Sequence, residues 1–313
     1  MKTAFIFPGQ GAQKVGMGKE LCDRFDIART VFAEANDALN EDFQKLIFEG
    51  PIEVLTLTAN TQPAIVAVSI AALRAFQEVC NVRPDFVAGH SLGEFSALVA
   101  SGSLEFSDAI RTTRARGTFM QQAVPEGEGA MAAVMKLDDD VIAKVCREVS
   151  EGDVVSPANF NCPGQVVISG KANAVGRAST LLKEKGGRVI PLKVSAPFHC
   201  ALMASAATQL DAQLADVEFG LPVPPVVTNV EATPNMDAIR IRSLLVQQVT
   251  APVRWTESVR YMIDEGVSTF IEFGPGNVLA GLISKIDKSV EVISVGSPDG
   301  IEIAKETLEK KQS

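Results

Sequence analysis

The chain has 313 residues, of which 46% are hydrophobic and 21% are charged, a composition typical of a globular protein with one large or two modest domains. Its formal net charge of −9 argues against general nucleic-acid binding, which needs a basic surface. We expect neither a secretory signal nor a membrane span, because every apolar run is too short. The five cysteines have no C-x-x-C spacing, so we expect reduced thiols, no zinc site and a cytoplasmic protein.

The N-terminal part of the chain alternates predicted strands with predicted helices. Residues 3–7 and 85–88 have the pattern of short buried strands. Apolar residues at helical spacing predict helices over 62–80, 94–100 and 107–123. This alternation predicts a parallel sheet that is covered by helices on both faces.

The pattern changes after residues 125–129, which we interpret as a flexible linker. The predicted elements that follow are a strand at 130–135, a helix at 138–149, strands at 154–159 and 165–169, a helix at 172–185 and a strand at 188–194. This order is βαββαβ, the ferredoxin-like unit. We therefore expect a small domain at 128–195, inserted into a larger α/β domain made of 1–127 and 196–313.

The α/β pattern resumes after the inserted unit. It predicts a helix from residue 201, a strand near 226–229 and a helix around 239–249. A strand at 269–273 runs into Gly274-Pro275-Gly276, which we interpret as a structural turn before another helix. Residues 309–313 have the composition of a frayed tail.

The segment Gly89-His90-Ser91-Leu92-Gly93 lies between a predicted strand and a predicted helix. A G-x-S-x-G in that position is typical of a nucleophile elbow, a turn so tight that small residues must flank the serine. Ser91 would then stand at the carboxyl end of the strand with its hydroxyl exposed. The backbone N–H groups that follow it would point at a bound substrate.

A serine nucleophile needs a base, and the chain has two histidines. His90 precedes Ser91 in a tight turn, so we expect its side chain to point away from the serine and to be packed and hydrogen-bonded. His199 lies where the last predicted strand of the small domain returns to the large one. A histidine at such a junction is more often structural, but beside an elbow serine His199 is the best candidate base.

An acyl-transfer serine also needs donors for the developing oxyanion. The turn at residues 7–11 follows the first strand, and it either presents backbone N–H groups beside the elbow or is a plain strand-to-helix turn. Gly9 and Gly11 fit the start of a dinucleotide fingerprint. Lys14 stands where its third glycine would be, so we reject that interpretation.

One charged residue is predicted on the inner face of a helix. Over 107–123, Arg116 shares a face with Ala109 and Met120, whereas Arg111 and Arg114 lie off that face and are expected in solvent. A buried arginine needs an anionic partner. That partner is either a structural Asp or Glu, or a substrate carboxylate bound by both guanidinium nitrogens.

Several segments together resemble the malonyl-CoA:acyl carrier protein transacylases of fatty acid synthesis. They are FPGQG at 7–11, GHSLGE at 89–94, RARGTFMQQAVPEG at 114–127, NFNCPGQVVISG at 159–170, APFHCALM at 196–203 and PVRW at 252–255. The resemblance covers residue 5 to about 280, in the expected order. It implies an α/β-hydrolase-like large domain with an inserted ferredoxin-like small domain.

The resemblance also implies roles for individual residues. Ser91 is the nucleophile that becomes malonylated, His199 is the general base and then the acid, and Arg116 holds the malonyl carboxylate. The backbone N–H groups of Gln10 and Leu92 form the oxyanion hole.

Further residues are assigned by the same resemblance. The family lacks a triad aspartate, and a backbone carbonyl, here that of Gln248, orients its histidine. Asn159 and Gln62 match residues that line the family's cleft. Phe198 matches the malonyl-selective pattern and disfavours a branched methylmalonyl unit, although one pocket residue excludes a methyl group by only ~1–3 kcal/mol.

The implied substrates are malonyl-CoA and the phosphopantetheine thiol of holo acyl carrier protein, with no further cofactor, and the family suggests a monomer. Alternatives are a serine hydrolase or thioesterase, a carrier-protein-binding module without activity, and an acyltransferase of polyketide synthesis. Carrier proteins of the pathway are acidic, so docking on this acidic chain needs a local basic patch. The candidates are Lys183, Lys185, Arg188 and Lys193, or Lys285 and Lys288.

Overall fold

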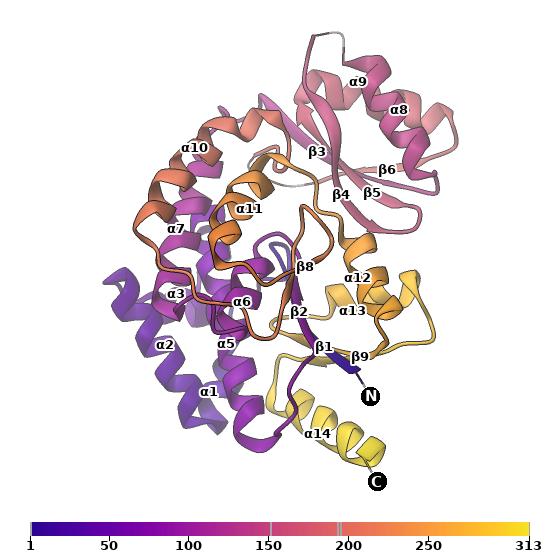
Figure 1. Cartoon of the computed structure of the whole chain (residues 1–313). Helices are drawn as coiled ribbons and strands as arrows, with labels where there is room; N and C mark the ends of the chain where they lie inside the picture. Colours follow the sequence, from indigo (N-terminus) through magenta and orange to yellow (C-terminus); the bar gives the residue numbers. More distant parts are fainter. Residues whose placement is uncertain (1, 151, 193, 195, 313) are drawn as a thin grey trace.

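A computed structural model of the chain describes residues 2–150, 152–192, 194 and 196–312, and within them it forms two sheets (Figure 1). The larger sheet has the strand order β10-β9-β1-β2-β7-β8. Its strands are β1 (Lys2–Phe7), β2 (Phe86–Gly89), β7 (Val226–Val227), β8 (Pro234–Asn235), β9 (Val267–Phe273) and β10 (Glu291–Val295). All neighbours pair in parallel except β7 and β8, so the predicted parallel sheet is present.

Helices cover both faces of this sheet. Alternate residues of a strand point to opposite sides, so apolar side chains on both sides need helices to bury them. Phe5 and Phe7 of β1 belong to one core, which most of the helices build, whereas Ala4 and Ile6 belong to a second core. The helices of the first core are α1 (Lys19–Arg24), α2 (Asp26–Leu39), α3 (Phe43–Glu49), α4 (Ile52–Leu55), α5 (Thr58–Val79), α6 (Gly93–Ala100), α7 (Phe106–Gln122), α10 (Ala204–Gln213), α11 (Ala238–Thr250) and α14 (Pro298–Gln312). The second core is closed by α12 (Trp255–Asp264) and α13 (Val278–Ile286).

The smaller sheet is antiparallel and has the order β4-β5-β3-β6. Its elements in chain order are β3 (Gly129–Met135), α8 (Asp139–Val149), β4 (Val155–Cys162), β5 (Gln165–Lys171), α9 (Ala172–Glu184) and β6 (Arg188–Pro191). The two helices pack on one face and share a separate core with the strands. This is the βαββαβ topology that the sequence predicts. The boundaries 128–195 remain a prediction.

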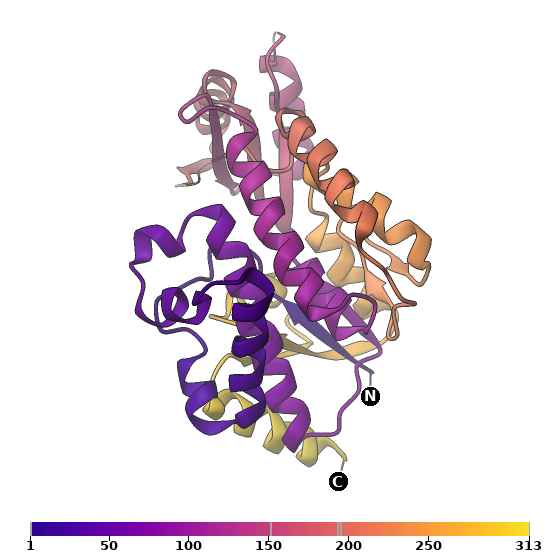
Figure 2. The ribbon, with the colours of Figure 1, turned by 90° about the vertical axis from the view of Figure 1, so that its left-hand side faces the viewer.

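Two connections fix the small unit against the large one. Helix α7 runs from the large sheet towards the small sheet, and residues 123–128 connect it to β3 (Figure 2). Strand β4 is hydrogen-bonded to the large unit, because Phe160 N donates to Val253 O and Val253 N donates to Ala158 O, both at 2.9 Å. The cleft between the two units is therefore lined by elements whose backbones are tied together.

The N-terminal helices α1 to α4 and the helix α12 are absent from the sequence prediction, because most of them are too short for a clear apolar period. Helix α5 begins at Thr58, earlier than expected, with Pro63 inside it. Strand β7 ends at Val227, so Asn229 lies in a turn rather than in the predicted strand.

The C-terminal region also differs from the prediction. Strand β10 follows α13, and α14 then extends to Gln312, where the sequence suggested a frayed tail from residue 309. This helix is ordered because Ile301, Ala304 and Leu308 are buried against the large sheet. Strand β6 ends at Pro191 rather than at 194.

The basic residues considered for docking are on the surface where they are described. Lys183, Lys185 and Arg188 are exposed at the end of α9 and the start of β6, and Lys285 and Lys288 are exposed at the end of α13. Lys193 lies outside the described residues, as does Ser195 at the predicted domain boundary.

Candidate active site

The turn between β2 and α6 has the geometry of a nucleophile elbow. Ser91 has φ of 50°, a left-handed conformation that is uncommon for a residue with a side chain. A Cβ atom on Gly89 would overlap the backbone of Gly93, and a Cβ on Gly93 would overlap the carbonyl of Phe7. Glycine is therefore required at both positions. The backbones of Phe7, Gly89 and Gly93 pack closely together, and this packing keeps Ser91 in its strained conformation.

His199 is brought to Ser91 across 108 positions of the chain. Ser91 Oγ lies 2.7 Å from His199 Nε2, and His199 Nδ1 lies 2.8 Å from the backbone carbonyl of Gln248. A carbonyl only accepts, so Nδ1 carries the proton and Nε2 is free to accept from the hydroxyl. Burial, followed by the charge of Arg116, lowers the pKa of His199 to about 3, so the imidazole is neutral at physiological pH.

His90 has a different role from His199. Its Nε2 atom lies 2.8 Å from Asn161 Oδ1, and its ring lies 5.7 Å from the ring of Trp255. Burial lowers the pKa of His90, which keeps this ring neutral as well. The side chain is packed and hydrogen-bonded away from the serine hydroxyl, as the sequence predicts.

Arg116 projects from α7 to the serine and is almost fully buried, with 1% of the residue exposed. Its guanidinium donates to Gln62 Oε1 at 2.8 Å, to Gln248 Oε1 at 2.9 Å and to Ser91 Oγ at 3.3 Å. Its Nε atom is buried with no hydrogen-bond partner in the described part of the chain. A buried cation held only by neutral acceptors has capacity left for an anion.

These groups open into one cavity of about 120 Å³. Its lining includes eight residues that the sequence analysis singles out: Gln10, Gln62, Ser91, Leu92, Arg116, Asn159, Phe198 and His199. The backbone N–H groups of Gln10 and Leu92 make no hydrogen bond to the described residues, which leaves both available at the cavity. Gln248 lies behind the lining and contacts it through Arg116 and His199.

The arrangement combines a serine paired with a neutral imidazole, two free N–H groups and a buried cation. The first two features suit acyl transfer through a covalent serine ester, and the third suits an acyl group that ends in an anion. Among the residues that the structure describes, no cluster of three or more His, Cys, Asp or Glu side chains could hold a metal ion.

Comparison with known proteins identifies the family. The sequence profile of the acyl transferase domain matches residues 4–298. The malonyl CoA-acyl carrier protein transacylase of Bacillus subtilis (strain 168) is 49% identical over 99% of this chain and 98% of its own length. The enzyme of that name from Escherichia coli (strain K12) is 48% identical over 97% of this chain and 98% of its own length.

Solved structures agree with the sequence comparison. An acyl carrier protein S-malonyltransferase from Vibrio cholerae has a TM-score of 0.96 and 46% identity, covering 97% of this chain and all of that one. A malonyl-transacylase solved in complex with its type II polyketide acyl-carrier protein has a TM-score of 0.96 and 45% identity, covering 98% of this chain and 100% of that one. The chain belongs to the malonyl CoA-acyl carrier protein transacylases. The fold class expected from the sequence is thereby confirmed.

The cavity of this transacylase is also lined by residues that were assigned no role from the sequence. Met120, Met131, Leu192 and Val194 complete its apolar wall. Met120 shares the inner face of α7 with Arg116, as the sequence predicts. Met131, Leu192 and Val194 stand in no motif with chemistry of its own, so the sequence held no signal for them.

Two further residues lie behind the lining. Asn229 clamps the elbow, because its Oδ1 accepts from Ser91 N at 2.6 Å and its Nδ2 donates to Gly89 O at 2.6 Å. Glu94 accepts from Asn229 N at 3.0 Å and is 2% exposed. An acidic residue in the first turn of an otherwise apolar helix was the available signal for Glu94.

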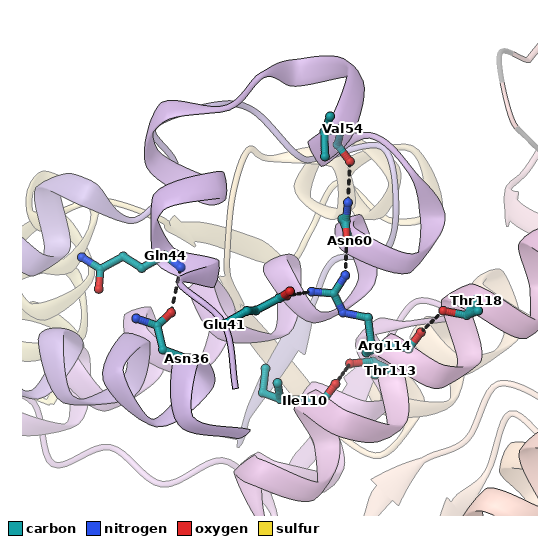
Figure 3. A network of polar contacts seen from close by, with 9 residues as sticks. All are labelled: Asn36, Glu41, Gln44, Val54, Asn60, Ile110, Thr113, Arg114 and Thr118. Carbon is teal, nitrogen blue, oxygen red and sulfur yellow. Dashed lines mark hydrogen bonds and ion pairs between the residues drawn. The ribbon is translucent and has the colours of Figure 1, made fainter. Parts of the chain in front are cut away.

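One prediction about the same helix was wrong. Arg114 does not face solvent: its side chain is 24% exposed and lies in a network of polar contacts (Figure 3). It donates to Asn60 Oδ1 and pairs with the carboxylate of Glu41. The helices α2 and α3, which the sequence analysis did not predict, are what cover this side of α7. Arg111, by contrast, is half-exposed and pairs with Asp108, as expected for a solvent-facing residue.

Proposed function

We propose that the protein transfers the malonyl group of malonyl-CoA to the phosphopantetheine thiol of acyl carrier protein, through a malonyl ester on Ser91. One observation carries this proposal: Ser91 Oγ is 2.7 Å from a neutral imidazole and 3.3 Å from a buried guanidinium. The first contact supplies the base that the nucleophile needs. The second supplies the charge that recognises the carboxylate of the malonyl group.

In the first half-reaction, His199 Nε2 takes the hydroxyl proton while Ser91 Oγ attacks the thioester carbonyl. The backbone N–H groups of Gln10 and Leu92 receive the oxyanion of the tetrahedral intermediate. When the carbon–sulfur bond breaks, the imidazolium returns the proton to the leaving thiolate. CoA departs as a thiol, and the acyl group remains on Ser91.

The second half-reaction repeats these steps with another thiol. His199 takes the proton from the pantetheine thiol of the carrier protein, the sulfur attacks the malonyl ester, and Ser91 regains its proton as the bond to oxygen breaks. Both thiols use one site in turn, which gives ping-pong kinetics. All of these steps use only groups of this chain and its two substrates.

Selectivity in this proposal comes from Arg116 and the cavity wall. An acetyl group has no carboxylate, so its binding would leave the buried guanidinium without an anion. Gln62 and Asn159 supply polar contacts in the cavity, and Phe198 limits the space beside the acyl carbon. We place the reaction in fatty acid synthesis in the cytoplasm, and the five free cysteines support a reducing compartment.

A serine hydrolase is the competing function. It would use the same serine and histidine, and an aspartate would accept the hydrogen bond from Nδ1 of the histidine. In α/β-hydrolases this aspartate lies between the serine and the histidine in the chain. Here the partner of Nδ1 is the backbone carbonyl of Gln248, which favours the transacylase.

The two functions are separated by intact mass measured after a brief mix with malonyl-CoA. We expect a malonyl adduct on the wild type and none on the control variant Ser91→Ala. Holo acyl carrier protein should discharge the adduct much faster than buffer alone. Equal discharge by water would establish a hydrolase, and an adduct on both proteins would exclude Ser91 as the nucleophile.

A further inference from the structure

Gln248 touches all three of the residues that the proposed mechanism uses most. Its Nε2 donates to the backbone carbonyl of Ser91 at 3.0 Å, and its Oε1 accepts from Arg116 at 2.9 Å. Its own backbone carbonyl receives His199 Nδ1. The same Nε2 also donates to Glu94 Oε2 at 2.8 Å. A single buried residue therefore links nucleophile, base and cation to one buried carboxylate.

The orientation of this amide is decided by its two charged neighbours. A guanidinium only donates hydrogen bonds, and an ionised carboxylate only accepts them. Gln248 must therefore turn its oxygen to Arg116 and its nitrogen to Glu94. If the carboxylate were absent, the nitrogen would keep only the carbonyl of Ser91 as an acceptor, and a flipped amide would cost less.

Arg116 has no carboxylate within ion-pair distance among the described residues. The charge that compensates it is that of Glu94, which raises the pKa of Arg116 against the larger, lowering effect of burial. The amide of Gln248 stands between the two. A direct ion pair would occupy the guanidinium, whereas a separation by one amide keeps it charged, oriented and open to a further anion.

We propose that Glu94 is a positioning residue that sets the preference of the site for acyl groups that end in a carboxylate. It acts through Gln248, whose amide it orients, and Gln248 in turn holds Arg116 beside Ser91. This inference rests on the proposed function, because it concerns the selectivity of the same acyl-transfer site. Glu94 touches neither the cavity nor the serine hydroxyl, so it is not a catalytic residue.

The test is Glu94→Gln at pH 8, which is above the pKa of about 7 of Glu94, so that the wild-type side chain is ionised. The variant keeps an acceptor oxygen for both N–H donors but removes this negative charge. We expect the KM for malonyl-CoA to rise and the malonyl-to-acetyl preference to fall, each roughly tenfold, the scale of one hydrogen bond to a charged group. The kcat for acetyl loading should stay close to that of the wild type, because Ser91 and His199 keep their contact. A merely structural role would lower both loadings together.

The matched control is Glu272→Gln. Glu272 is also a fully buried glutamate, and it accepts from the backbone N–H groups of Leu279 and Ala280 at 3.0 and 2.9 Å. It lies at the start of α13, away from the cavity lining. We expect this variant to keep the wild-type preference, which separates a general loss of buried charge from the effect of Glu94.

A second variant tests the route through the amide. Gln248→Ala keeps the backbone carbonyl for His199 but removes the link between Glu94 and Arg116. The double variant with Glu94→Gln should have the same preference as Gln248→Ala alone, because both changes break one path. Independent, multiplying effects would overturn the inference, and so would a wild-type preference in either single variant. A wild type that forms no malonyl adduct would instead overturn the proposed function.

Discussion

Two arginines that are two positions apart on α7 have opposite surroundings. The guanidinium of Arg114 pairs with the carboxylate of Glu41 and donates to Asn60 (Figure 3). It also lies 4.8 Å above the ring of Phe43. Its charge is neutralised directly, and it joins α7 to α3, to α5 and to the turn between α2 and α3. Such an arginine stabilises a junction between helices and already has its own anion.

Arg116 is the more deeply buried of the two and is the less well neutralised. Its partners are the neutral side chains of Gln62, Gln248 and Ser91, and the ring of Phe95 lies 5.7 Å away. Burial lowers the pKa of Arg116 to about 10, so the group stays charged at neutral pH. The two arginines of one helix therefore differ in their partners: Arg114 has a carboxylate, and Arg116 has only neutral acceptors. In the proposed function, this difference makes Arg114 a structural cation and Arg116 a functional one.

The largest effect is expected when the incompletely neutralised cation is removed. Arg116→Ala should lower malonyl loading of Ser91 by roughly 100- to 1,000-fold, the scale of one lost buried charge pair. Acetyl loading should stay equal or rise, because the acetyl group no longer leaves a cation unpaired. Rates of adduct formation with malonyl-CoA and acetyl-CoA, followed by intact mass, measure both. If the two rates fall by the same factor, Arg116 does not read the carboxylate.

The elbow, the histidine beside it and the inward-facing arginine could be placed from the sequence, because each depends on a local signal, whereas their roles remain predictions. The glycines around Ser91, the scarcity of histidines and an arginine on the inner face of a helix can all be recognised one segment at a time. The surroundings of Arg114 were predicted wrongly because helical periodicity ranks residues by face only. Periodicity does not show that α2 and α3 pack over the polar face of α7 that carries Arg114.

The network behind the site was beyond sequence reasoning for the same reason. Glu94 lies 135 positions from Asn229 and 154 positions from Gln248, and amide side chains carry no sequence pattern that identifies their partners. Asn229 was expected at the end of a strand near 226–229. Strand β7 ends at Val227, and Asn229 contacts the elbow from the turn that follows.

An intermediate effect, on the free energy of unfolding, is expected from a change in pH. It comes from Glu94, whose carboxylate compensates the charge of Arg116 without contacting it. Burial raises the pKa of Glu94 from 4.5 to about 7, against the opposing effects of Asn229 N, the Gln248 amide and Arg116. The charged group that faces it is Arg116 from α7. A raised carboxyl pKa means that the folded protein holds this proton up to a higher pH than the unfolded chain does.

The contribution of Glu94 to stability is therefore full below pH 4.5 and is lost as the pH rises through 7. Between pH 5 and pH 8 the loss should be about 2 to 3 kcal/mol in the free energy of unfolding. Urea unfolding at both pH values measures it in the wild type and in Glu94→Gln, whose amide does not titrate. The variant should lose less stability than the wild type over this range, and parallel losses would contradict the raised pKa.

The smallest effect is expected at the neutralised arginine, and it should be on stability alone. Arg114→Ala removes one partly exposed ion pair, the hydrogen bond to Asn60 and a contact with Phe43, so the free energy of unfolding should fall by about 1 to 2 kcal/mol. The malonyl-to-acetyl preference should stay at the wild-type value, because Arg116 keeps all of its partners. Urea unfolding and the two loading rates test both statements on one protein. A changed preference would mean that Arg114 and Arg116 are coupled. The two arginines could then not be divided into one structural and one functional cation.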